Sequence, residues 1–227
     1  MTGQPIIFIT GTGTDVGKTF VAKLLVYGWK CNYWKPIQTG VESDCGDTFT
    51  MINYPIGKWV TEAFQPTYQL IKPLSPLEAM EYEQESVDIK LEDFKVPHGS
   101  EQLPLIIEGA GGVCVPITKK LELTTDLITH LATSTQRPFY VVVVADSGLG
   151  TLNHTLLTWD YLERNIPKKN LLGCILNGKK NGGNRKILEQ FGVTIVAEIP
   201  VCKNDEMSLD VTNNLPSLES VTNIHRS

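Results

Sequence analysis

The feature that most constrains this chain is a glycine-rich segment running from Gly11 to the dipeptide Lys18-Thr19. It follows the apolar run Ile6–Ile9 and precedes a stretch whose apolar residues recur with helical spacing. At such a strand-to-helix turn, backbone N–H groups can wrap a polyphosphate, the lysine can reach the β and γ oxygens, and the threonine can ligate Mg²⁺. The alternative is a glycine turn followed by an incidental Lys-Thr pair. The strand before and the helix after the turn favour a phosphate-binding loop, with the helix N-terminus adding partial positive charge.

Short apolar runs alternate with helical segments along the rest of the chain. Several runs are apolar on consecutive residues, which is typical of strands covered on both faces. The alternation predicts βαβ units and an α/β fold: a mostly parallel sheet with helices on both faces, in a three-layer sandwich. The expected strands are Ile6–Ile9, Tyr33–Trp34, Leu105–Ile107, Tyr140–Val144, Cys174–Leu176 and Val193–Val196. The expected helical stripes are Phe20, Leu24 and Leu25; Leu123, Leu127, Ile128 and Leu131; and Leu152, Leu156, Leu157 and Tyr161.

The domain count follows from the absence of any repeat, low-complexity tract or charge block that would mark a linker. We therefore expect one domain over residues 1–227. The segment from about Gly57 to Pro104 is rich in proline and fits the alternation less well. We interpret it as an excursion from the sheet, with one helix near Ser75–Glu85.

Composition excludes several classes of protein. The 227 residues carry 20 Lys and Arg against 25 Asp and Glu, a net charge of −5, so nothing attracts nucleic acid or an anionic membrane in general. The longest apolar run, Phe139–Ala145, is far shorter than the ~20 residues of a membrane helix. Five scattered cysteines without a C-x-x-C pair are typical of reduced thiols. Because Met1 runs almost directly into a strand, we expect no signal or transit peptide and a cytoplasmic protein, with the mitochondrial matrix left open.

Charged residues follow the apolar runs where a parallel sheet would hold its ligand. Glu108 ends one run and is followed at once by glycines, so with the Thr19 hydroxyl it is a candidate ligand of Mg²⁺. Asp47 is a second candidate, although its turn-rich surroundings also suit a solvated carboxylate. Lys35 ends another run and is fixed by Pro36. Two lysines that converge on one site, Lys18 and Lys35, suit a reaction that joins two anions.

The segment Gly148-Leu149-Gly150-Thr151 opens a predicted helix, and here two interpretations stay open. Its free N–H groups could bind an anion such as a carboxylate. It could equally be an ordinary helix start capped by Thr151 or Ser147. The histidines show no ligand spacing, and no serine, cysteine or histidine constellation suggests covalent catalysis.

Taken together, these blocks resemble those of the dethiobiotin synthetase family. In order and approximate spacing they cover the chain from about residue 6 to 202, and the loop has the one extra residue between Gly11 and Gly17 that is usual in this family. The matching blocks are Gly11 to Thr19, Lys35-Pro36-Ile37-Gln38-Thr39-Gly40, Glu108-Gly109-Ala110-Gly111-Gly112-Val113, Asn177-Gly178 and Glu198-Ile199-Pro200.

The resemblance implies a P-loop NTPase fold and a Mg²⁺- and ATP-dependent ligase of biotin synthesis. Such an enzyme closes the ureido ring of dethiobiotin from 7,8-diaminononanoate and CO₂, through a carbamate and a carbamic–phosphoric anhydride. The resemblance also implies a homodimer. It gives Lys18, Lys35 and Thr14 catalytic roles.

The resemblance further implies which residues hold each ligand. The ATP phosphates would be bound by the loop residues Gly13, Thr14, Asp15, Val16, Gly17, Lys18 and Thr19. Adenine would be contacted by Asn177 and Pro200, and Mg²⁺ would be bound by Thr19, Asp47 and Glu108. Thr14, Lys35 and Thr39 would hold the carbamate. The helix start Gly150, Thr151, Leu152 and Asn153 would receive the substrate carboxylate.

The chain departs from the family pattern at three places. Gly13 stands where the family usually has aspartate, the stretch between Lys18 and Lys35 is a few residues shorter, and Leu77 stands where relatives often have histidine. None of these changes removes a group needed for phosphoryl chemistry.

Two other functions compete with this interpretation. The first is an ATPase switch of the cell-division or partition type, which carries an extra lysine inside the loop; no lysine lies between Gly11 and Gly17. The second is a simple small-molecule kinase, which would share Lys18 and Thr19 but gives no reason for Lys35.

Overall fold

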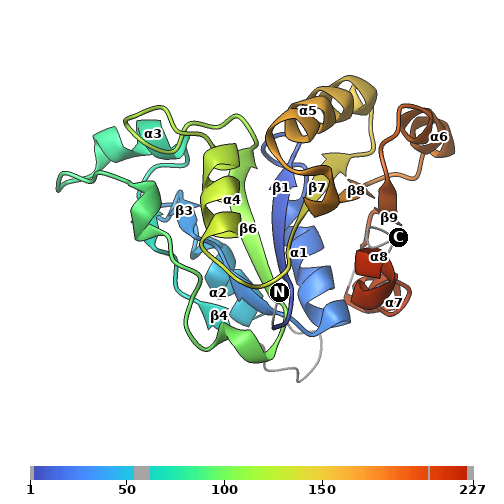
Figure 1. Cartoon of the computed structure of the whole chain (residues 1–227), viewed down its shortest axis with the longest axis horizontal. Coiled ribbons are helices and arrows are strands. Elements are labelled where there is room, and N and C mark those ends of the chain that lie inside the picture. Colours follow the sequence, from blue (N-terminus) through green and yellow to red (C-terminus); the bar gives the residue numbers. More distant parts are fainter. Residues whose placement is uncertain (1–2, 54–61, 204, 224–227) are drawn as a thin grey trace.

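The computed structural model describes residues 3–53, 62–203 and 205–223. Its centre is a seven-stranded sheet in the order β4-β2-β6-β1-β7-β8-β9, and all neighbouring strands are parallel. The phosphate-loop strand β1 lies between β6 and β7 (Figure 1), so both neighbours bring their ends to the loop. The strands are β1 (Ile6–Gly11), β2 (Asn32–Trp34), β4 (Ala63–Phe64), β6 (Leu105–Gly112), β7 (Phe139–Asp146), β8 (Leu171–Asn177) and β9 (Ile195–Ile199).

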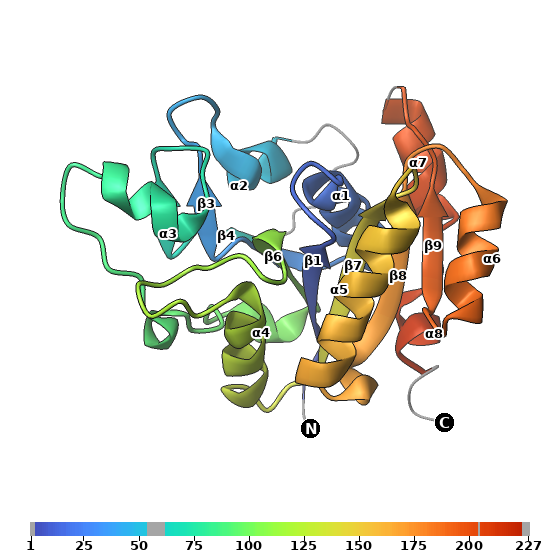
Figure 2. The ribbon, with the colours of Figure 1, turned by 90° about the horizontal axis from the view of Figure 1, so that it is seen from above.

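Helices cover both faces of this sheet, which confirms the predicted three-layer α/β sandwich. Figure 2 shows α4 and α5 on one side of the strands and α1 on the other. The helices that flank the sheet are α1 (Lys18–Trp29), α4 (Thr124–Thr133), α5 (Thr151–Asn165), α6 (Gly182–Gln190), α7 (Asp205–Asn213) and α8 (Leu218–Asn223).

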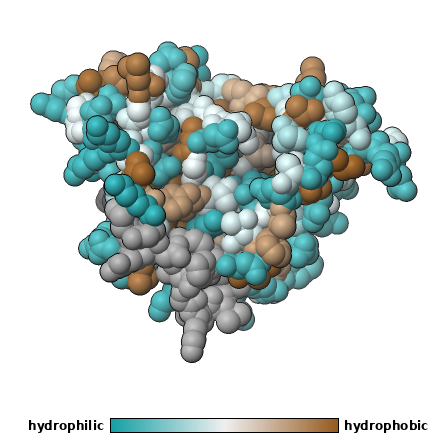
Figure 3. Space-filling view, turned by 180° about the vertical axis from the view of Figure 1, so that it is seen from behind, coloured by the Kyte–Doolittle hydropathy of each residue, from teal (hydrophilic) through white to brown (hydrophobic). Residues whose placement is uncertain are grey.

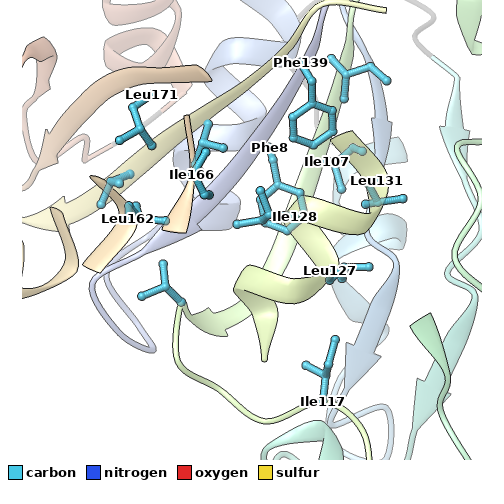
Figure 4. Packing of buried hydrophobic residues seen from close by; sticks show 14 of the residues in the cluster. Phe8, Ile107, Ile117, Leu127, Ile128, Leu131, Phe139, Leu162, Ile166 and Leu171 are labelled. Carbon is cyan, nitrogen blue, oxygen red and sulfur yellow. The ribbon is translucent and has the colours of Figure 1, made fainter. Parts of the chain in front are cut away.

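The buried side chains form two apolar clusters, one on each face of the sheet. In β1 successive side chains point to opposite faces, so Phe8 joins the cluster beneath α4 and α5, and Ile7 joins the cluster beneath α1. Figure 4 shows Phe8 packed among Ile107, Ile128 and neighbouring residues of the first cluster. Because strands buried on both faces have no polar side, the consecutive apolar runs were a valid signal for this sheet.

Between β2 and β6 the chain leaves the main sheet, apart from the edge strand β4, which was not predicted, and builds one wall of the site. This region holds α2 (Gly46–Ile52) and a small parallel pair, β3 (Ile37–Thr39) with β5 (Tyr68–Leu70). The helix predicted near Ser75–Glu85 is shorter: α3 (Pro76–Ala79), capped by the Ser75 hydroxyl, continues only as the 3₁₀ turn Met80–Tyr82. Its chain becomes extended at Glu83. The first residues of the predicted excursion, 57–61, lie outside the described residues.

Two further expectations were wrong in detail. The last strand is Ile195–Ile199, later than the predicted Val193–Val196, so Glu198 lies within the strand and does not follow it. Leu157 was predicted to lie on one apolar helical stripe with Leu156, yet 64% of its surface is exposed. At about 100° per residue, Leu157 lies nearly opposite Trp159, which is buried against the sheet.

Polar residues dominate the described part of the face seen from behind (Figure 3). Seen from behind, hydrophilic side chains spread over the described parts of the face, and hydrophobic ones are scattered among them (Figure 3). Within the described residues, no helix has the length and apolar character needed to cross a bilayer.

Candidate active site

The predicted phosphate-binding loop connects β1 to α1. Gly17 precedes the first residue of α1 with φ = 90°, and Asp15 also has a left-handed φ of 58°. The Lys18 ammonium turns back over the loop and donates to the carbonyl of Gly13 at 2.9 Å. Asn177, at the end of β8, donates from Nδ2 to the carbonyl of Val16 at 3.0 Å and so ties the loop to the sheet.

Among the loop glycines, Gly17 combines a positive φ with the closest contact that an added side chain would meet. A Cβ there would lie 2.1 Å from Nδ2 of Asn177, and its positive φ is strained for any L residue. We expect Gly17→Ala to weaken binding of a non-hydrolysable ATP analogue by at least about tenfold, since a residue forced into this region costs about 1–3 kcal/mol before any clash.

Gly13→Ala is the matched control for that substitution. A Cβ at Gly13 meets no atom within 4 Å, and this glycine does not have a positive φ. Calorimetric titration should therefore find affinity close to that of the unchanged protein. Equal losses in the two variants would contradict the role given to the Gly17 backbone.

A cleft of about 710 Å³ opens beside the loop at the carboxyl edge of the sheet. Its walls come from the loop, from the segment after β2, from α2, from residues 73–76 at the start of α3 and from the end of β6. It brings together most of the predicted site residues, namely Thr14, Asp15, Gly17, Lys18, Thr19, Lys35, Thr39, Asp47 and Glu108.

Glu108 is the centre of a buried network in this cleft. The residue is fully buried, and its Oε1 accepts from the Thr19 hydroxyl at 2.7 Å. Lys35 Nζ donates to the same oxygen at 3.2 Å and forms a second ion pair with Asp47. The other oxygen, Oε2, accepts from the Tyr33 hydroxyl at 2.8 Å.

Burial and neighbouring charges act differently on the two lysines. Burial lowers the pKa of Lys18, and the negative charge of Glu108 offsets only part of this effect. Burial also acts to lower the pKa of Lys35, but the charges of Glu108 and Asp47 outweigh it and the pKa is raised. Burial and the adjacent Glu108 charge raise the pKa of Tyr33 well above its usual value, so its hydroxyl stays a hydrogen-bond donor.

The donor set fits a divalent cation that prefers oxygen ligands. The Lys35 ammonium contacts both Asp47 and Glu108, which shows that the two carboxylates converge on a single positive charge. The Thr19 hydroxyl adds a third oxygen beside them. Among the described residues there is no cluster of three or more His, Cys, Asp or Glu side chains suited to a metal. A cation here would complete its shell with phosphate oxygens and water, as Mg²⁺ commonly does.

Other predicted site residues lie outside this cleft. Asn177 touches the loop from β8, and Pro200 lines a separate pocket of about 260 Å³ beyond β9. Gly150, Thr151 and Leu152 line another pocket of about 360 Å³ at the start of α5. Asn153 is exposed on the same helix. Within one subunit the structure therefore does not bring the α5 start into the cleft.

Two buried residues of the site were not predicted. Gln38 accepts from the backbone N–H of Asp47 at 2.9 Å and donates to the carbonyl of Thr39 at 2.8 Å, which fixes the start of α2 against β3. Asp47 consequently lies in the first turn of a helix, where we had expected only turns. Gln38 belongs to the block that follows the second predicted strand, and this position is a sequence signal for a site residue. Tyr33 lies inside that strand, where the sequence pattern indicates only an apolar strand residue.

Comparison with known proteins first gives the class. The profile of a family described as "AAA domain" matches residues 6–205. A ParA family ATPase from Chlorobium tepidum has a similar fold, with a TM-score of 0.52 and 13% identity, covering 97% of this chain and 98% of that one. The cell division protein FtsY from Thermotoga maritima gives a TM-score of 0.53 and 12% identity, over 93% and 69%. At these identities the likeness concerns the fold alone, that of the P-loop NTPases.

Closer relatives define the family. The ATP-dependent dethiobiotin synthetase BioD of Paramagnetospirillum magneticum is 43% identical over 197 residues, covering 85% of this chain and 86% of that protein. The enzyme of the same name from Lawsonia intracellularis is 34% identical, over 93% and 97%. The chain belongs to the ATP-dependent dethiobiotin synthetase family. The biotin biosynthesis bifunctional protein BioCD of Bordetella avium is 37% identical, but this chain spans only 45% of its length.

Proposed function

We propose that this protein is a dethiobiotin synthetase that uses ATP to close the ureido ring of dethiobiotin from 7,8-diaminononanoate and CO₂. The observation that carries the proposal is the placement of a second lysine, Lys35, in the cleft of the phosphate-binding loop, 3.2 Å from Glu108. A phosphoryl-transfer site for ATP alone needs only Lys18 and the loop. An additional cation in the same cleft suits a second anionic reactant, which a carbamate supplies.

The residue roles in this proposal follow the cleft. Lys18 and the backbone of residues 13–19 would bind the ATP phosphates, with Thr14, Lys35 and Thr39 holding the carbamate and Asn177 and Pro200 contacting adenine. Thr19, Asp47 and Glu108 would hold Mg²⁺, which when bound neutralises charge on the phosphate oxygens. Support for the metal role comes from the convergence of both carboxylates on one cation.

The proposed reaction proceeds through two activated species. One amine of the diamine adds CO₂ and loses a proton, giving a carbamate, which is a poor acyl donor because its oxygen is a poor leaving group. A carbamate oxygen then attacks the γ-phosphorus of ATP, releasing ADP and forming a carbamic–phosphoric anhydride. The second amine attacks the carbonyl carbon, phosphate leaves and the ring closes. The chain's contribution is positioning by Thr14 and Thr39 and charge neutralisation by Lys18 and Lys35.

One assay separates this function from its competitors. We expect phosphate release to require both the diamine and bicarbonate, and ¹³C from labelled bicarbonate to appear in the ring carbonyl by mass spectrometry. A partition-type ATPase would release phosphate without either substrate, and a kinase would phosphorylate the diamine without bicarbonate. Either of those results would refute the proposal.

The quaternary arrangement belongs to the same proposal. The start of α5 lies in a different pocket from the cleft of its own subunit, so we propose a homodimer in which the substrate carboxylate reaches Gly150–Asn153 of a second copy. We further propose that residues 1–227 form one domain, supported by the matched profile over 6–205, and that the protein is cytoplasmic, as its bacterial relatives suggest.

Asn153 allows a test of the shared site. Asn153→Ala should raise KM for the diamine about two- to tenfold, the value of one neutral hydrogen bond, and leave ATP affinity unchanged. Asn165→Ala, at the opposite end of α5, is the matched control and should change neither.

Mixed dimers provide the stronger form of this test. Subunits carrying Lys18→Ala, mixed and exchanged with subunits carrying Asn153→Asp, should regain activity because each mixed dimer keeps one site with both parts intact. No recovery despite demonstrated subunit exchange would mean that the substrate does not bridge two chains.

A further inference from the structure

We infer that Tyr33 is a positioning residue for the metal site, one that fixes the Glu108 carboxylate so that Oε1 alone faces Thr19 and the cleft. The inference rests on the function proposed for this cleft, because it concerns how that cleft holds a divalent cation. It gives a specific duty to a buried strand residue outside the phosphate-binding loop.

The strand register places Tyr33 beside the carboxylate. Tyr33 pairs with Ile106 in the parallel β2–β6 ladder, and Glu108 lies two residues further along β6 on the same face. The Tyr33 ring is fully buried among the apolar residues beneath α1. Its hydroxyl therefore reaches along the strand direction to Oε2 of Glu108, at 2.8 Å.

The two oxygens of Glu108 consequently have different partners. Oε1 meets the groups of the cleft, the Thr19 hydroxyl at 2.7 Å and the Lys35 ammonium at 3.2 Å. Oε2 is held by the tyrosine from the apolar side. A cation in the cleft would thus be ligated through one oxygen of Glu108, because the second is committed to a neutral donor.

Among the described contacts, the hydrogen bond from the Tyr33 hydroxyl is the only one that restrains Glu108 from the buried side, and removing the hydroxyl removes it. A carboxylate free to rotate about its terminal torsion presents either or both oxygens, since that torsion is broad. Loss of the Tyr33 hydroxyl would also leave Oε2 of Glu108 buried without a hydrogen-bond donor. Such an environment is unfavourable for the negative charge that attracts the metal. Tyr33 therefore acts on the cation through Glu108 and touches no reacting atom itself.

Tyr33→Phe tests the inference, because it removes only the hydroxyl and keeps the ring. We expect the affinity for Mn²⁺, measured by electron paramagnetic resonance in the presence of a non-hydrolysable ATP analogue, to fall about tenfold or more. Affinity for the same analogue in EDTA should stay within twofold. Tyr140→Phe is the matched control, since Tyr140 is buried in the same cluster but lies on β7, a strand that does not pair with the Glu108 strand β6.

These measurements distinguish positioning from packing. A hydroxyl needed only for the stability of the core would lower the unfolding midpoint and weaken metal-free and metal-bound nucleotide alike. Mn²⁺ affinity within twofold of the unchanged protein, or equal losses with and without metal, would overturn the inference. Neither diamine nor bicarbonate is present, so the outcome does not depend on whether the protein closes the ureido ring.

Discussion

Replacing Lys18 with alanine should lower the rate of ring closure by at least about a hundredfold and leave the fold intact. The ammonium lies over the loop, with Nζ 2.9 Å from the carbonyl of Gly13, where the β and γ phosphates of ATP are expected. Contacts between a charge and a hydrogen-bond partner are worth about 1.5–3 kcal/mol, and more where negative charge grows in the transition state. Steady-state assay of dethiobiotin formation measures the loss.

Stability should not follow activity in this variant. Since burial lowers the pKa of Lys18, the folded protein holds this charge in an unfavourable environment, and its removal should leave the melting temperature little changed. Lys119→Ala removes an exposed lysine outside the cleft and should affect neither quantity. Near-normal ring closure by Lys18→Ala would refute the assignment of the phosphate-binding loop.

Replacing Lys35 with glutamine should abolish product formation while ATP and Mg²⁺ still bind. We assign Lys35 to the carbamate, so calorimetry with a non-hydrolysable analogue should give nearly unchanged nucleotide affinity. The same substitution should reduce the free energy of unfolding by roughly 1.5–3 kcal/mol without divalent cation, because the buried Glu108 loses a charged donor. Addition of Mg²⁺ should restore part of that stability.

Lys72→Gln is the matched control for this second effect. Lys72 also pairs with a carboxylate, Glu42, at 2.8 Å, but both side chains are 38% exposed. An exposed pair contributes about 0–1 kcal/mol, so this variant should unfold almost as the unchanged protein does. Loss of nucleotide binding in Lys35→Gln, with product chemistry retained at saturating ATP, would reverse our assignment.

The sequence allowed the sheet to be predicted well because its signals are local. Consecutive apolar residues such as Tyr140–Val144 mark a strand buried on both faces, and the glycines before Lys18 mark the turn after β1. The small β3–β5 pair escaped prediction because each of its strands has three residues and alternation over three residues is not distinctive. Its pairing joins residues 31 positions apart, such as Ile37 and Tyr68, and local periodicity carries no information on such a contact.

The charged residues of the cleft were predicted and their partners were not. Glu108, Lys35 and Asp47 could be identified because each is a charge beside a strand end or turn. The arrangement in which Lys35 lies between both carboxylates depends on how α2 is seated against β3, which Gln38 decides. The role of the Tyr33 hydroxyl could not be predicted, because a tyrosine in a predicted strand is ordinarily interpreted as an apolar ring in the core.

The hydrogen bond between Asn177 and the carbonyl of Val16 would link the binding of the base of a nucleotide to the binding of its phosphates. One amide side chain restrains the loop that meets the phosphates and stands at the strand end proposed to meet the base. The base and the phosphates of ATP would then contact two parts of the protein that are joined by this hydrogen bond. A base that shifts Asn177 would shift the peptide preceding Gly17, and a phosphate that tightens the loop would steady the amide in return. Such reciprocity would make binding of the base and binding of the polyphosphate interdependent, although the two groups lie at opposite ends of ATP.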